Sequence, residues 1–180
     1  VFHHFQGVSE QAEARHVRPK LFHTFSNSEY FNRGGSLIHT DVTGTRDIEP
    51  PADSRIYFVS SGPHAFGPFP PVQAEGAAGL NNPVNRNPVT RALLKDLDQW
   101  VVNGTPPPPN RIPHISDGTL VATEKAGWPA IPGVHFPVPY LKTYRLDFGP
   151  LWNKGIVVNE PPKVGQVYVG LVPAVDANGN

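Results

Sequence analysis

The sequence predicts an α/β fold with parallel strands, one packed helix and a proline-rich irregular arm. Two short apolar runs, at about 20–25 and 55–60, each lead into a polar turn, which is typical of buried strands. An amphipathic helix is expected over about 88–103, after the second strand. Strands that alternate with helical patterns favour a parallel sheet covered by helices.

Composition limits the class of protein. A chain of 180 residues can form one domain with a core, although 38% of its residues are hydrophobic and 22 are proline. The formal net charge is zero, so no electrostatic footprint for nucleic acid or an anionic membrane is present. No run approaches the roughly 20 apolar residues that cross a bilayer. Cysteine is absent, which excludes a disulfide framework and thiolate catalysis and leaves the compartment undecided.

Both ends of the sequence favour a piece of a longer protein. The chain begins with Val1 and contains no methionine. Its last residues, 175–180, are typical of the start of a hairpin turn, but no return strand follows them. We therefore interpret the sequence as an internal or C-terminal part of a longer chain.

Each predicted strand is followed by a residue suited to acid–base chemistry. Glu29 comes after the first strand and His64 after the second. Ligands of open α/β folds bind beyond the carboxyl ends of such strands. A carboxylate followed by a histidine is the second half of the Ser…Asp/Glu…His order of α/β-hydrolases. The first half is missing, because no serine stands in a Gly-x-Ser-x-Gly turn.

The clearest predicted element is the helix over about 88–103. Asn87 is a good N-cap, and Pro88 suits the first helical position, where its missing N–H is not needed. Asn103 and Gly104 are expected to end the helix before the prolines at 106–109. One apolar stripe is expected to face the sheet: Val89, Leu93, Leu94, Leu97, Trp100 and Val101.

The remaining sequence is mostly irregular. Residues 67–85 are rich in glycine, proline and asparagine and predict a long loop. Beyond the helix, segments at 140–148 and 165–172 are the expected strands. The chain is thus divided into a core part, 1–104, and a proline-rich extension, 105–180, that wraps the core.

Several motifs resemble a family of bacterial and fungal α/β-hydrolase-domain proteins, over most of the chain. The resemblance implies that the nucleophilic serine, in a Gly-x-Ser-x-x-Gly-like elbow, lies upstream of Val1. The segment 60–64 departs from the family, which has a Gly-Thr-Gln-His-like stretch there, but it keeps the histidine. The motifs that carry the resemblance are 19–24, 28–30, 36–41, 44–47, 55–57, 63–64, 87–88, 91–94, 97–98, Trp100, 107–109, 117–120, 131–134 and 172–173.

His64 is the candidate general base, since an imidazole titrates near neutral pH and can activate a serine hydroxyl. Glu29 is the candidate acid that orients it, and Asp41 and Asp47 remain alternatives because they also lie between the two strands. A surface histidine and a solvated turn carboxylate are the simpler interpretations. The pair His39 and Asp41 gives too few ligands for a metal site, so no metal and no cofactor are expected.

These observations predict a fragment or subunit of a serine hydrolase that cleaves small carboxylic esters. An upstream segment or a separate chain would carry the serine and the oxyanion hole. The alternative is a non-catalytic structural or binding subunit that keeps the hydrolase frame, which the missing nucleophile supports. Four aromatic residues on proline-rich segments either line an apolar substrate pocket or pin these segments to the core: Phe66, Phe69, Trp128 and Phe136.

Overall fold

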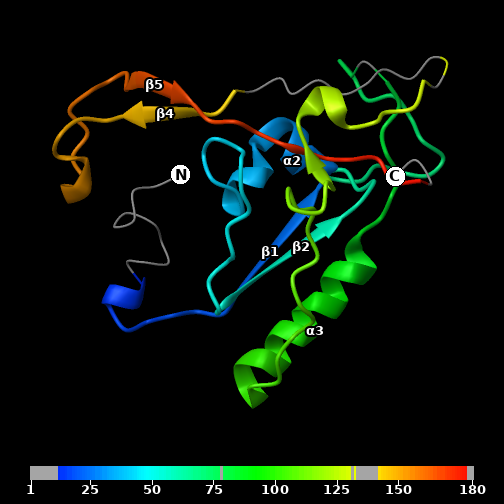
Figure 1. Cartoon of the computed structure of the whole chain (residues 1–180). Helices are drawn as coiled ribbons and strands as arrows, with labels where there is room; N and C mark the ends of the chain where they lie inside the picture. The colour runs from blue at the N-terminus through cyan, green and yellow to red at the C-terminus, as the bar shows by residue number, and fades with distance from the viewer. Residues whose placement is uncertain (1–11, 78, 131, 133–141, 178–180) are drawn as a thin grey trace.

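A two-stranded parallel sheet lies at the centre of the fold (Figure 1). The computed structural model describes residues 12–77, 79–130, 132 and 142–177. Strand β1 (Leu21–Ser26) pairs with β2 (Ser54–Val59) along its whole length, close to the ranges that the sequence predicts. The parallel pair and the mixed helices and strands confirm the predicted α/β class.

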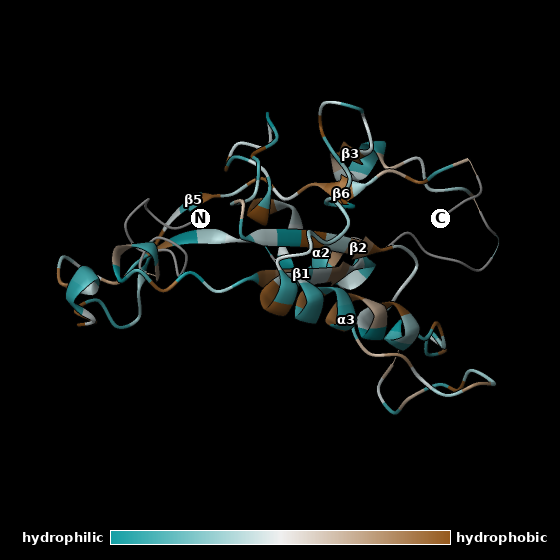
Figure 2. Cartoon of the chain, turned by 90° about the horizontal axis from the view of Figure 1, so that it is seen from below, coloured by the Kyte–Doolittle hydropathy of each residue, from teal (hydrophilic) through white to brown (hydrophobic). Residues whose placement is uncertain are grey.

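Helix α3 (Asn87–Asn103) covers one face of this sheet (Figures 1 and 2). Side chains alternate along a strand, so Phe22 and Tyr57 share one face, where their rings pack edge to face at 5.1 Å. Trp100 of α3 lies on the same face, with its ring 5.8 Å from that of Phe22. Aromatic contacts therefore hold the helix against the sheet.

The start and the buried face of α3 differ from the prediction. Arg86 is the N-cap, so Asn87 is the first helical residue, while Gly104 ends the helix as expected with a φ of 67°. Leu93 and Trp100 are buried. A sheet of two strands is narrower than the apolar stripe and leaves one flank of the helix uncovered. The exposed members of the stripe are Val89, Leu94 and Val101.

Helix α2 (Asn27–Arg33) follows β1 directly and packs on the opposite face of the sheet. Its buried Tyr30 contacts the rings of Phe25 and Phe58 edge to face, at 5.9 and 5.1 Å. Gly34 ends α2 with a φ of 62°, a conformation that glycine adopts without strain. A short 3₁₀ helix (Gly35–Ile38) continues the chain.

Segments from the C-terminal half complete the core around α2. Strand β3 (Leu120–Val121) pairs antiparallel with β6 (Val172–Pro173), and Leu120 and Leu171 pack on Tyr30. The segment at Arg111 runs along the outer edge of β2 and exchanges backbone hydrogen bonds with it. The segment at Arg111 therefore covers β2 on the side away from β1.

The other two strands form a hairpin that extends away from the sheet (Figure 1). Strands β4 (Tyr144–Asp147) and β5 (Lys163–Val167) are antiparallel and exposed along their whole length. The remaining short 3₁₀ helices are Thr123–Lys125 and Trp152–Lys154. In the described part of the chain, no helix is both long and apolar enough to span a membrane.

Candidate active site

The carboxylate of Glu29 is fixed at the first turn of α2. Its Oε2 atom accepts hydrogen bonds from the backbone N–H of Ser26, at 2.6 Å, and from the Ser26 hydroxyl, at 2.5 Å. Serine at the N-cap and glutamate three residues later is the sequence signature of a capping box. The same carboxylate therefore closes the helix end and keeps its second oxygen available.

That second oxygen meets the imidazole of His64. Glu29 Oε1 lies 2.5 Å from His64 Nδ1, although 35 positions separate the two residues in the chain. They come together because β1 and β2 are parallel, so both strands end at the same edge of the sheet. An ionised carboxylate only accepts hydrogen bonds, so Nδ1 carries the proton and Nε2 has a free lone pair.

The two partners differ in their exposure to solvent. The Glu29 side chain is 14% exposed, whereas the His64 side chain is 72% exposed. Within the described residues, Nε2 of His64 makes no hydrogen bond. The imidazole thus presents its basic nitrogen to a group that approaches from outside.

Two opposing effects act on the pKa of Glu29. Burial raises the pKa, but the hydrogen bonds from Ser26 and from the His64 imidazole favour the charged form and outweigh it. The net pKa of Glu29 lies below its ordinary value. The carboxylate is therefore ionised at neutral pH and can stabilise a positive charge on the imidazole.

The loop that carries His64 is held by side chains from three other segments. Ser61 turns the chain after β2 with a φ of 57°. The His64 N–H donates to Ser28 Oγ at 3.1 Å, Asn82 Nδ2 donates to the Ser61 carbonyl at 2.9 Å, and Arg86 donates to the His64 carbonyl at 2.7 Å. No local pattern in the sequence predicts these contacts, because each joins residues more than 20 positions apart.

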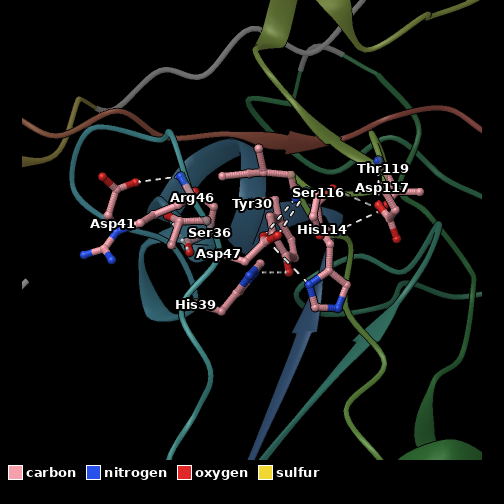
Figure 3. Close-up of polar contacts among 12 residues, drawn as sticks. Tyr30, Ser36, His39, Asp41, Arg46, Asp47, His114, Ser116, Asp117 and Thr119 are labelled. Carbon is pink, nitrogen blue, oxygen red and sulfur yellow. Dashed lines mark hydrogen bonds and ion pairs between the residues drawn. The ribbon is translucent and has the colours of Figure 1, made fainter.

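Asp41, the first alternative acid, closes a turn of its own (Figure 3). It accepts hydrogen bonds from the Thr43 hydroxyl and from the backbone N–H groups of Thr45, at 2.7 Å, and Arg46, at 3.1 Å. The Thr43 hydroxyl first, and then these N–H groups, hold the pKa of Asp41 well below its usual range. In the described part of the chain this carboxylate makes no bond to His64.

Asp47, the second alternative acid, connects its own loop to the 113–119 loop by hydrogen bonds (Figure 3). Its two oxygens accept the backbone N–H groups of Ile115, at 2.8 Å, and Ser116, at 3.0 Å. Burial raises the pKa of Asp47, but these hydrogen bonds outweigh it and the net pKa is lowered. The structure thus brings Glu29 to His64 and gives Asp47 contacts in the 113–119 loop.

His39 is buried beside α2 (Figure 3). Its Nε2 lies 2.8 Å from the Tyr30 hydroxyl, and only 1% of the residue is exposed. Burial, with a smaller contribution from nearby His114, lowers the pKa of His39 to about 4, although Asp47 opposes the shift. No cluster of metal-ligating side chains occurs in the described ranges, and His39 and Asp41 make separate contacts.

Burial of neutral His39 predicts a pH-dependent stability. The unfolded imidazole has a pKa near 6.5, so below this pH the unfolded chain binds a proton that the folded chain does not bind until about pH 4. The contribution of neutral His39 to the free energy of unfolding is therefore fully present above pH 6.5 and is lost as the pH is lowered toward 4. Between pH 7 and pH 5 the loss from this residue is about 2 kcal/mol.

Urea unfolding at the two pH values measures this effect. His39→Gln keeps a hydrogen-bonding partner for Tyr30 but has no imidazole, so the loss between pH 7 and pH 5 should become smaller by that amount. The exposed His16 supplies the matched control, His16→Gln, which should keep the loss of the unchanged protein. An equal loss in all three proteins would contradict the assignment to His39.

A cavity of about 530 Å³ lies at the edge of the sheet where β1 and β2 end. It is lined by Asn27 and Ser60, which follow β1 and β2, and by residues of the 110–119 and 173–176 segments. Trp128 also lines it. Phe66 and Phe69 are exposed outside this cavity, and Phe136 lies outside the described residues.

Comparison with known proteins identifies the family of this chain. A family model described as an alpha/beta hydrolase domain matches residues 5–180, which is nearly the whole chain. No curated protein and no solved structure matches the chain. A hydrolase-like function follows from the family match, and the parallel strands agree with the fold that this match implies. The chain belongs to the alpha/beta hydrolase domain family.

Proposed function

We propose that this chain supplies the acid and the base of a Ser–Glu–His triad that cleaves carboxylic esters. The observation that carries the proposal is the contact of 2.5 Å between Glu29 Oε1 and His64 Nδ1, with the imidazole 72% exposed. A carboxylate on Nδ1 leaves Nε2 as the base, which is the arrangement that activates a serine. Glu29 orients the ring and His64 moves the proton.

The first half of the reaction forms an acyl-enzyme. His64 Nε2 takes the proton of the serine hydroxyl while the serine oxygen attacks the ester carbonyl carbon. The resulting oxyanion is stabilised by backbone N–H groups next to the serine. Glu29 stabilises the imidazolium, which then gives its proton to the leaving alcohol as the bond between carbon and alcohol oxygen breaks.

The second half releases the acid. Water takes the position of the alcohol, and His64 Nε2 removes its proton as the water oxygen attacks the acyl carbon. The imidazolium returns this proton to the serine oxygen when the acyl bond breaks. Serine, histidine and glutamate are then restored, and the net reaction is the hydrolysis of one ester.

The proposal assigns the serine to an upstream segment or a separate chain. Hydroxyls close to the pair have other contacts: Ser26 donates to Glu29, and Ser28 accepts the backbone N–H of His64. An incoming serine would reach the imidazole from its exposed side. Backbone N–H groups that accompany this serine would form the oxyanion hole.

A fluorophosphonate probe tests the proposal. The probe is added to the protein purified with any associated chain, and the labelled peptide is identified by mass spectrometry. We expect one labelled serine outside residues 1–180 and hydrolysis of p-nitrophenyl butyrate that the probe abolishes. Labelling should be lost in His64→Gln, since the probe reacts with an activated serine.

Two results would contradict the proposal. Absence of both labelling and ester hydrolysis would favour a non-catalytic binding subunit that keeps the hydrolase frame. A labelled serine within the 180 residues would contradict the assignment of the nucleophile to another segment. Heat-denatured protein is the control for non-specific labelling.

A further inference from the structure

A guanidinium group holds the backbone of His64. Arg86 is the N-cap of α3, and its Nη2 donates to the His64 carbonyl oxygen at 2.7 Å. The Arg86 carbonyl accepts the N–H of Thr90, at 3.1 Å, so the first turn of the helix fixes the arginine backbone. This hydrogen bond therefore connects the start of α3 to His64, the residue that contacts Glu29.

The backbone of His64 is held by hydrogen bonds on both sides. The N–H of His64 is bonded to Ser28 of α2, and its carbonyl is bonded to Arg86. The side chain of His64 is 72% exposed, so packing restrains it little. Its position relative to Glu29 therefore depends on how firmly the backbone is held on both sides.

Stability alone does not explain Arg86. Its Nη1 is buried and makes no hydrogen bond within the described residues. An unsatisfied buried donor is unfavourable, and charged groups are the most costly to bury. A neutral side chain at the helix start would avoid this cost, but it would lose the charged donor to the His64 carbonyl.

We propose that Arg86 is a positioning residue of the His64 site. It keeps the His64 backbone where Nδ1 can donate to Glu29, and so it maintains the tautomer that leaves Nε2 as the base. The expected effect of Arg86 on ester hydrolysis rests on the proposed function. The expected effect of Arg86 on the tautomer of His64 does not, because the tautomer is a property of the protein without substrate.

The test compares Arg86→Met, which keeps the aliphatic stem without any donor, with Arg86→Lys, which keeps a charged donor. Arg91→Met, at an exposed position of α3, is the matched control. Long-range ¹H–¹⁵N NMR of the imidazole reports which nitrogen carries the proton at a pH where the ring is neutral. We expect the Nδ1-protonated form in the unchanged protein, Arg91→Met and Arg86→Lys, and a shift toward the Nε2-protonated form in Arg86→Met.

Kinetics with p-nitrophenyl butyrate give the second readout. Arg86→Met should lower kcat by about 10²-fold, as expected for a misplaced catalytic group, and leave KM within about twofold. Arg86→Lys should recover most of this loss. A purely structural role would instead lower the thermal midpoint and leave the tautomer of the folded protein unchanged.

Each outcome decides the proposal. The unchanged tautomer in folded Arg86→Met overturns it, whatever the kinetics. If Arg86→Met does not fold, folded Arg86→Lys decides, and an Nε2-protonated ring in that variant overturns the proposal. If the unchanged protein hydrolyses no ester, the proposed function fails while the NMR comparison still tests Arg86.

Discussion

Replacement of His64 by alanine is expected to lower kcat for ester hydrolysis by about 10⁴-fold without unfolding the protein. Without the imidazole, no group at this position can take the proton of a serine hydroxyl or return it to the leaving alcohol. The side chain is 72% exposed, so its removal leaves no cavity. Steady-state kinetics with p-nitrophenyl butyrate measure the loss, and circular dichroism with thermal unfolding checks the fold.

Exposed His16 provides the matched control for this variant. His16→Ala removes another exposed imidazole, 48 positions from His64 in the sequence, and should leave kcat close to that of the unchanged protein. Hydrolysis by His64→Ala at the original rate would remove this residue from the mechanism. The hydrolase frame would then lack the base that we assign to it.

Glu29→Gln is expected to cost about 10³- to 10⁴-fold in kcat. Glutamine also occurs at the third position of a capping box, so its oxygen can still accept the Ser26 N–H and the first turn of α2 is retained. Its amide has no negative charge to stabilise the imidazolium, and its NH₂ group can donate to Nδ1, which favours the wrong tautomer. Ester kinetics and the NMR tautomer of His64 measure both effects.

The two other carboxylates supply controls for this variant. Asp41→Asn and Asp47→Asn should keep kcat near that of the unchanged protein, because neither carboxylate contacts His64 in the described residues. Asp47→Asn should also lose about 1–3 kcal/mol of stability, since its two oxygens bind the Ile115 and Ser116 amides. If kcat fell strongly in Asp47→Asn while Glu29→Gln stayed active, the acid would be Asp47 and not Glu29.

Local patterns explain what the sequence could predict. An apolar run such as 21–26 specifies a strand by itself, and Pro88 followed by periodic apolar residues specifies a helix. The order of Glu29 and His64 after two such strands was also visible, and parallel pairing then brings them to one edge. Helix α2 was not among the predicted elements, although Ser26 and Glu29 form the local signature of a capping box.

Contacts between residues that are distant in the sequence could not be predicted from such local patterns. The exposure of Leu94 depends on the width of the sheet beneath α3, which no helical period reveals. Asp47 contacts amides 68 and 69 positions later, and Arg86 contacts a carbonyl 22 positions earlier. Such contacts depend on how loops return to the core, so a turn carboxylate and a catalytic one have the same local sequence.

The shared use of one carboxylate has a consequence for inactivation. Glu29 joins the first turn of α2 to the imidazole through different oxygens, so fraying of this turn releases both at once. Local opening of a helix end needs less free energy than global unfolding. Loss of turnover in denaturant should therefore begin while the central strands still protect their amides from hydrogen exchange.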